Sequence, residues 1–312
     1  MELSLFDLHC DTPYRMLTEG GALEQNSFAV SLERARNYRR YVQIMAHWTP
    51  PALSDEEGWE QLLAMRQNLL ADPAVLAGNV DVSTCVTASL PDKPLLLLAV
   101  EDARVLSGEL SRVDRLWELG FRILTPLWAG ISSLGGAHDT EEGLTPFGRT
   151  AVRRAVELGM LPDLSHASEQ SAEEILSIAA ELHRPVLASH SNVYEIRRST
   201  RNLRPWQIRA ILDCAGIIGI NLHVPFLTER DDATAEDILR HVDAFLSAGA
   251  SEALAIGGDM DGAQLPSGFS SVDTLGDLAE EMLRRNYPES LIKNLFFGNA
   301  YRFAATYLSH RK

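Results

Sequence analysis

Apolar residues along this chain recur with the period of a β-strand in some segments and with the period of an α-helix in others, and the two kinds of segment alternate. Phe6, Leu8 and Cys10 alternate with polar residues, as in a strand, until Pro13 ends the strand. Residues 94–101 form an almost continuous apolar run, which is typical of a strand covered on both faces. Strands are predicted at 6–13, 41–46, 94–101, 121–125, 159–166, 185–190, 216–221 and 254–259.

Helices are predicted between most of these strands. Ser54 stands three residues before Glu57, as in a capping box, and apolar residues with helical spacing follow. The other predicted helices are 28–40, 145–158, 168–182, 204–214, 234–246 and a helical tail at 275–308, broken at Gly298 and Asn299. Eight strands alternating with helices predict one (β/α)8 TIM barrel domain over residues 1–312. A doubly wound sheet is the competing fold, but no Gly-x-Gly-x-x-Gly follows a strand.

Composition narrows the possible partners. The chain has 312 residues, of which 46% are hydrophobic, and a formal net charge of −15. This acidic balance argues against nucleic acid and anionic membrane surfaces as partners. The three cysteines form no Cys-x-x-Cys pair, and neither a signal peptide nor an apolar run of about eighteen residues is present. We expect a soluble cytoplasmic protein.

Ionisable side chains end five of the eight predicted strands. Because the carboxyl ends of barrel strands meet at one mouth, these side chains are expected to lie together. They are His9 and Asp11, Glu101, His166, His190, and Asp259. Imidazoles and carboxylates are zinc ligands, and the set is large enough for two metal ions. The alternatives are a buried His satisfied by its neighbouring Asp, or polar strand ends with no shared role.

The segments around these residues resemble the membrane (renal) dipeptidase family of zinc peptidases, family M19. The resemblance rests on residues 7–11, 99–101, 163–168, 188–192, 201–203 and 257–262, which occur in the family's order. It implies two zinc ions per chain. His9 and Asp11 would bind one ion, His166 and His190 the other, and Glu101 would bridge them.

The resemblance also implies roles beyond the metal ligands. Arg201 would bind the terminal carboxylate of a small dipeptide, which a guanidinium fork fits well. Asp259 would act as general base near a water activated between the two ions. Glu101, as the bridging ligand, would also be a catalytic residue. The glycines around Asp259 would let the backbone pack close to the site. Relatives are commonly homodimers.

The sequence departs from the family at one substrate-binding position. Many members have a His after the fourth strand, where this chain has Trp128. An indole donates one hydrogen bond but cannot become a cation, so the substrate contact there would differ. His223, after the seventh strand, is a further candidate for substrate contact.

Other polar residues have less specific expectations. His47 either lines the pocket or packs in the core, and Asp7 either orients a metal ligand or is simply a packed, hydrogen-bonded residue. Asp261 is expected to fix a loop. Surface positions are expected for His138, His183, His241 and His310.

Two alternatives to a dipeptidase stay open. One is a related barrel amidohydrolase that acts on another amide or on a lactone. The other is a catalytically silent barrel that binds a carboxylate ligand or a partner protein.

Overall fold

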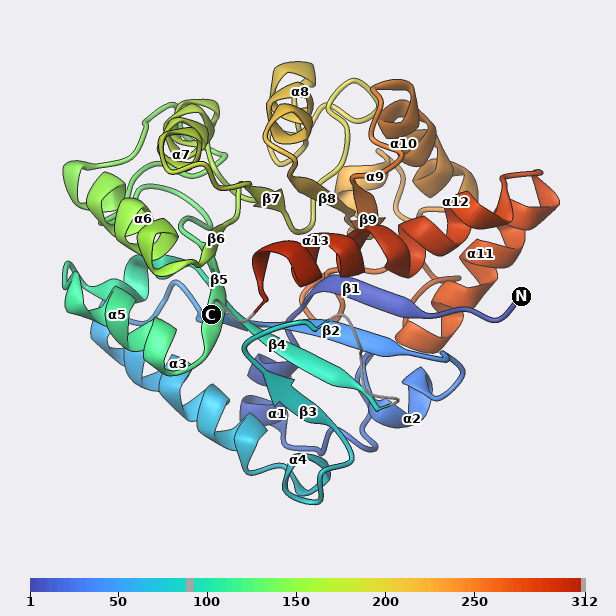
Figure 1. The fold of residues 1–312 in the computed structure, drawn as a ribbon, viewed down its shortest axis with the longest axis horizontal. Coiled ribbons are helices and arrows are strands. Elements are labelled where there is room, and N and C mark those ends of the chain that lie inside the picture. The colour runs from blue at the N-terminus through green and yellow to red at the C-terminus, as the bar shows by residue number, and fades with distance from the viewer. Residues whose placement is uncertain (88–92, 310–312) are drawn as a thin grey trace.

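The computed structural model describes residues 1–87 and 93–309, and they form a barrel of parallel strands surrounded by helices (Figure 1). The strand order is β6-β5-β4-β2-β1-β9-β8-β7, with β3 paired to β4 outside this path. A bridge between Asp163 and Leu187 brings the two ends of the path together, so the barrel is nearly closed. The strands are β1 (Leu5–Cys10), β2 (Tyr41–Trp48), β3 (Asp81–Ser83), β4 (Leu95–Glu101), β5 (Phe121–Thr125), β6 (Leu161–Pro162), β7 (Leu187–Ala188), β8 (Ile217–Ile220) and β9 (Leu254–Ile256). The predicted (β/α)8 fold is confirmed.

Several helices begin where a side chain caps the first turn. The Ser54 and Glu57 capping box is present, and the hydroxyls of Thr145 and Ser168 accept hydrogen bonds from the first turns of α6 and α7. The helices are α1 (Thr12–Glu19), α2 (Leu32–Ala35), α3 (Asp55–Leu70), α4 (Pro73–Leu76), α5 (Ser111–Glu118), α6 (Pro146–Leu158), α7 (Glu169–Glu181), α8 (Pro205–Asp213), α9 (Val224–Leu227), α10 (Ala235–Ser247), α11 (Leu275–Arg284), α12 (Glu289–Lys293) and α13 (Asn299–Tyr307). Short 3-10 turns lie at η1 (Ala103–Leu106) and η2 (Val272–Thr274), and a π-helical turn, η3 (Asn294–Gly298), joins α12 to α13.

Several predicted boundaries are wrong. The helix predicted at 28–40 is reduced to α2, because Ser31 caps a helix that begins only at Leu32, and the backbone of Ala29 is held by Asp261. Pro13 lies in the first turn of α1, where a proline is tolerated, and β1 ends at Cys10.

The other errors concern short strands and the helical tail. Strands β6 and β7 keep only two residues each, because the carboxylate of Asp163 takes the backbone N–H groups of Ser165 and Ser189 beyond them. The tail breaks before Pro288, whereas Gly298 continues the helix with α-helical dihedral angles. The three-residue β3 was not predicted.

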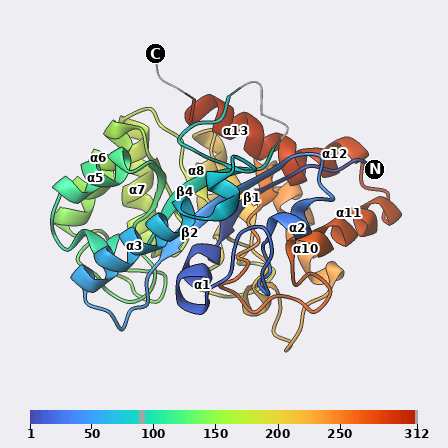
Figure 2. The same cartoon turned by 90° about the horizontal axis from the view of Figure 1, so that it is seen from below.

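Two apolar layers hold the barrel. Helices pack on the outside of the strands, while Phe6, Leu97, Ile123 and other inward residues fill the interior. Ala300 and other residues of α13 join this interior cluster, so α13 closes the amino-terminal end of the barrel. Figure 2 shows α13 and α1 at opposite ends of the molecule, which leaves the carboxyl ends of the strands beside α1 as the open mouth. Among the described helices, none combines the length and the apolarity that a bilayer crossing needs.

Candidate metal centre

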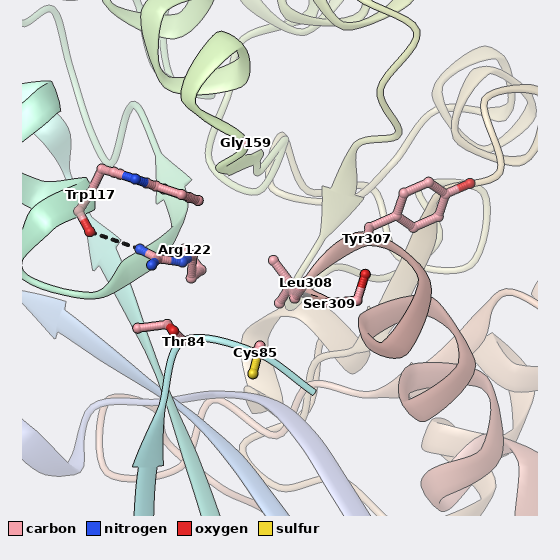
Figure 3. Close-up of a pocket in the computed structure, with 8 residues that line it drawn as sticks. All are labelled: Thr84, Cys85, Trp117, Arg122, Gly159, Tyr307, Leu308 and Ser309. Carbon is pink, nitrogen blue, oxygen red and sulfur yellow. Dashed lines mark hydrogen bonds between the residues drawn. The ribbon is translucent and has the colours of Figure 1, made fainter. Parts of the chain in front are cut away.

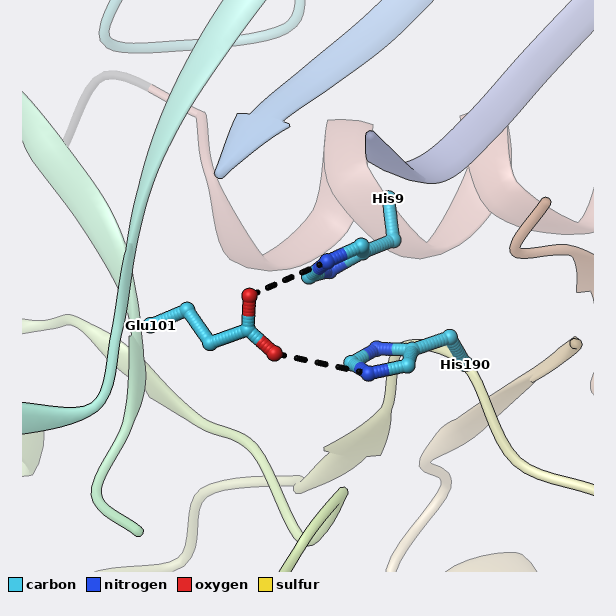
Figure 4. Close-up of side chains that lie close together, drawn as sticks. All are labelled: His9, Glu101 and His190. Carbon is cyan, nitrogen blue, oxygen red and sulfur yellow. Dashed lines mark ion pairs between the residues drawn. The ribbon is translucent and has the colours of Figure 1, made fainter. Parts of the chain in front are cut away.

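Glu101 lies at the middle of the mouth. Leu95, Leu97 and Ala99 of β4 belong to the interior cluster, so the alternation of the strand turns Glu101 inward as well. Its Oε1 lies 3.0 Å from Nε2 of His166 and 3.5 Å from Nε2 of His190. Its Oε2 faces the other way, 3.3 Å from Nε2 of His9 (Figure 4). One carboxylate therefore offers a separate oxygen to each of two groups of ligands.

His166 and His190 present unprotonated nitrogens to the same point. Nδ1 of His166 lies 2.9 Å from the carbonyl oxygen of Trp128, which can only accept, so Nδ1 carries the hydrogen. Burial, followed by the charge of Arg201, lowers the pKa of His166 to about 3, so Nε2 keeps its lone pair. The pKa of His190 is also lowered, chiefly by burial, and its Nε2 lies 3.0 Å from that of His166. Two lone pairs and a carboxylate oxygen at this spacing fit a shared zinc ion with Zn–N distances of about 2.0–2.1 Å.

His190 is oriented by a chain of hydrogen bonds that sequence reasoning missed. The hydroxyl of Ser189 donates to Oδ2 of Asp163 at 2.5 Å, and Nδ1 of His190 lies 2.7 Å from the same hydroxyl oxygen. Because the hydroxyl hydrogen goes to Asp163, the hydrogen between Ser189 and His190 comes from Nδ1. Thr125 also donates to Asp163, at 2.8 Å. Such partners fix which imidazole nitrogen is free to bind a metal.

The second ligand group joins His9, Asp11 and Asp259. The pairing of β1 with β2 shifts register between Asp7 and Cys10, and Cys10 packs in the outer layer although Leu8 faces the interior. Nε2 of His9 lies 3.5 Å from Oδ2 of Asp11 and 4.0 Å from Oδ1 of Asp259. The same nitrogen is buried and makes no hydrogen bond among the described residues.

The ionisable side chains of this group are crowded together, and this crowding shifts their pKa values. Burial, followed by the negative charge of Glu101, raises the pKa of Asp11 to about 7. Burial alone would lower the pKa of His9, but Glu101 and Asp11 raise it well above its usual value. A crowded set of carboxylates and an orphaned imidazole nitrogen is the arrangement that a divalent ion stabilises. The residues present therefore fit two metal ions.

Backbone close to the ligands requires glycine. A Cβ atom on Gly262 would lie 2.0 Å from Oδ2 of Asp11, and one on Gly257 would lie 1.9 Å from the carbonyl oxygen of Ser189. Asp7 ties the same region together, because its Oδ1 accepts hydrogen bonds from the backbone of His9 and of Gly258.

Asp259 is held at the edge of the centre. Its Oδ2 accepts a hydrogen bond from Nδ2 of Asn221 at 3.0 Å, which leaves Oδ1 on the side of His9. Asn221 also donates to the carbonyl oxygen of His190, so it links the two ligand groups. Sequence reasoning gave Asn221 no role, because a single asparagine after a strand carries no distinctive spacing.

Arg201 is a buried cation with no counter-ion in the described part of the chain. It is 4% exposed and donates from Nη2 to the carbonyl oxygen of His190 at 3.2 Å. Its Nε is buried without a hydrogen-bond partner, and no carboxylate of the described residues lies within ion-pair distance of it. Burying an unpaired guanidinium is costly, so this position favours an anionic ligand.

A cavity of about 370 Å³ opens over the metal centre. Trp128 and His223 both line it, together with Asp11, Glu101, His166 and Asp259. Arg201 is not among the described residues of this lining, but its guanidinium lies over the ring of Phe226, which is. Nδ1 of His223 accepts a hydrogen bond from the backbone of Gln264 at 3.0 Å, so the neutral ring carries its hydrogen on Nε2. Sequence reasoning missed three aromatic residues of this lining, Tyr14, Trp48 and Phe226.

A smaller cavity of about 190 Å³ lies at the amino ends of β5 and β6 (Figure 3). Arg122 stacks over Trp117 there and donates to the carbonyl oxygen of that residue at 2.8 Å. None of the predicted ligands or substrate-binding residues is among the described residues that line it. It is therefore separate from the candidate site.

The remaining histidines correct two predictions. His241 is fully buried and accepts a hydrogen bond from the backbone of Val193, so its expected surface position is wrong. His138 is half-buried and packs 6.0 Å from the ring of His166. His47 packs in the core, His183 is exposed as predicted, and His310 lies outside the described residues. Asp261 fixes a loop as predicted, because it accepts hydrogen bonds from Thr12 and Ala29.

The parallel barrel and the histidine–carboxylate centre at its mouth define a metal-dependent hydrolase of the TIM-barrel type. The sequence profile described as membrane dipeptidase (peptidase family M19) matches residues 1–309, and the chain belongs to this family.

Known proteins resemble the chain over most of its length. It is 29% identical over 258 residues to a Klebsiella pneumoniae protein described as an uncharacterized protein in the pqqA 5′ region. This alignment covers 77% of this chain and 92% of that protein. A solved metallopeptidase of family M19, dipeptidase AC, superposes with a TM-score of 0.89 at 25% identity, covering 99% of this chain and 100% of the other. A Rhodobacter sphaeroides metallopeptidase, solved with a phosphinate mimic of the dipeptide L-Ala-D-Ala, superposes with a TM-score of 0.88 at 24% identity, covering 98% and 100%.

Proposed function

We propose that this protein is a metal-dependent dipeptidase that cleaves the peptide bond of small dipeptides with two zinc ions. The observation that carries the proposal is the division of Glu101 between two ligand groups, with Oε1 toward His166 and His190 and Oε2 toward His9. Family membership and the dipeptidase named among the similar structures support the same activity.

The two ions would be held by His9 with Asp11 and by His166 with His190, and Glu101 would bridge them. Bound there, zinc supplies a hydroxide nucleophile at neutral pH and a Lewis acid for the scissile carbonyl. No side chain needs to act as nucleophile, and cleavage gives two free amino acids.

The chain's own residues position the substrate and move the proton. Arg201 pairs with the terminal carboxylate, because its buried charge has no counter-ion among the described residues and its Nε has no hydrogen-bond partner there. Asp259 takes the proton of the attacking water on Oδ1, because Oδ2 is held by Asn221, and passes this proton to the leaving amine. His223 offers its Nε2 hydrogen to a substrate oxygen, and Trp128 covers the cavity beside His166.

The test is turnover by the zinc-loaded protein on a panel of dipeptides, N-acyl amino acids and lactones. Release of amino acids from dipeptides, abolished by a chelator and restored by zinc, is the expected result. Turnover confined to N-acyl amino acids or lactones would contradict the proposal.

A further inference from the structure

The cavity has one wall made of three aromatic side chains, Tyr14, Trp48 and Trp128, which we call the aromatic wall. The rings of Tyr14 and Trp48 meet edge to face, with centroids 5.2 Å apart. The rings of Trp48 and Trp128 are tilted against each other, also with centroids 5.2 Å apart. The three residues come from α1, the end of β2 and the loop after β5, so the wall is assembled from distant parts of the chain.

Trp48, the middle residue of the aromatic wall, lies across the barrel from the residue that would hold the substrate's carboxylate. Arg201 follows β7, and Trp48 is the last residue of β2. In the strand order, β7 stands four strands from β2 in either direction around the barrel. A dipeptide with its carboxylate directed toward Arg201 and its scissile carbonyl at the metal centre therefore extends its amino-terminal residue toward Trp48.

The wall offers no charged partner to a substrate side chain. The described residues that line the cavity include no lysine or arginine. Their carboxylates Asp11, Glu101 and Asp259 belong to the metal centre, and Asp261 is already bound by Thr12 and Ala29. Burying a charged side chain in such a place is unfavourable, whereas apolar and aromatic side chains gain from burial.

We propose that the aromatic wall is the subsite for the amino-terminal side chain of the substrate and selects dipeptides with a large apolar or aromatic residue there. This inference rests on the proposed dipeptidase function. It identifies Trp48 and Tyr14 as specificity-determining residues.

The experiment compares kcat/KM for X-Ala dipeptides in which X is Gly, Leu, Phe, Lys or Glu. The wild-type protein is expected to favour Leu and Phe over Gly by about tenfold or more, and to disfavour Lys and Glu. Trp48→Ala is expected to lower the Phe-to-Gly ratio by about tenfold. Trp206→Ala is the matched control, because Trp206 is 39% exposed on α8 and bonds to Glu169, so this variant should keep the wild-type ratio.

Equal kcat/KM values for Gly-Ala and Phe-Ala, or a preference for Lys through cation–π contact, would overturn the inference. Circular dichroism checks that Trp48→Ala folds, and Tyr14→Ala provides a second variant with the same expected change in ratio. If no dipeptide is hydrolysed, the proposed function fails, and the wall is tested by ligand binding instead. Dissociation constants would then be measured from the quenching of tryptophan fluorescence. Tighter binding of Phe-Ala than of Gly-Ala would support the proposed subsite, and equal dissociation constants would overturn it.

Discussion

The Nε2 atoms of His166 and His190 lie 3.0 Å apart, and both face Oε1 of Glu101. Neither nitrogen carries a hydrogen, because the Nδ1 hydrogen of His166 goes to the carbonyl of Trp128 and that of His190 to the hydroxyl of Ser189. Two facing lone pairs repel each other unless a cation lies between them. The two lone pairs and the carboxylate oxygen are therefore already oriented toward one point where a metal ion can bind.

Ser189→Ala should weaken this metal position. Without the hydroxyl, nothing fixes the hydrogen on Nδ1 of His190, and loss of such a partner typically costs about 10–100-fold in metal affinity. Zinc affinity, measured by competition with a chelator, should fall by this factor. Ser191→Ala is the control, since the Ser191 hydroxyl contacts Ser165 and no imidazole. Equal affinities in the two variants would contradict the role of Ser189.

Gly262→Ala should disturb the other ligand group. The new Cβ would lie 2.0 Å from Oδ2 of Asp11, so that carboxylate must leave its present position beside His9. Zinc bound per chain and kcat should both decrease, the affinity by about tenfold or more. Gly268→Ala is the matched control, because a Cβ at Gly268 meets no atom within 4 Å. Full zinc content in Gly262→Ala would show that Asp11 is not needed.

Arg201→Ala should discriminate between substrates with free and with blocked carboxyl ends. Loss of the guanidinium should lower kcat/KM for a free dipeptide by about 10–100-fold more than for the corresponding carboxyl-terminal amide. Arg204→Ala serves as control, because Arg204 pairs with exposed Glu169 outside the cavity. Equal losses on both substrates would reject the carboxylate role.

Zinc binding should release protons, more of them at lower pH. The pKa of Asp11 is raised to about 7, chiefly by burial, and that of His9 is raised by its carboxylate neighbours, so below pH 7 both hold protons that a metal must displace. Zinc affinity should therefore fall as the pH decreases from 8 to 6. His166, with a pKa of about 3, stays neutral over this range and adds no pH dependence.

Calorimetric titration of zinc in buffers of different ionisation enthalpy measures this release. Asp11→Asn should reduce the number of protons released at pH 6, because an amide holds no titrating proton. A proton count at pH 6 that is the same in the variant and in the wild-type protein would contradict the account.

The sequence predicted the barrel because every long strand and most helices have the hydrophobic periodicity that is typical of their secondary structure. It predicted that the ionisable residues at the strand ends lie together, because the barrel geometry brings those ends to one mouth. His241 and β3 were missed for local reasons, since a histidine on an amphipathic helix and a three-residue strand give no distinctive pattern. Ser189, Asp163 and Asn221 were missed because their roles depend on hydrogen bonds between loops, which no spacing encodes.

The central claim is that Glu101 stands between two cations. Diffraction from a crystal of the zinc-loaded protein, collected on both sides of the zinc absorption edge, tests this directly. The account predicts two anomalous peaks, one on the Oε1 side beside His166 and His190 and one on the Oε2 side beside His9 and Asp11. A single peak, or peaks away from Glu101, would contradict it.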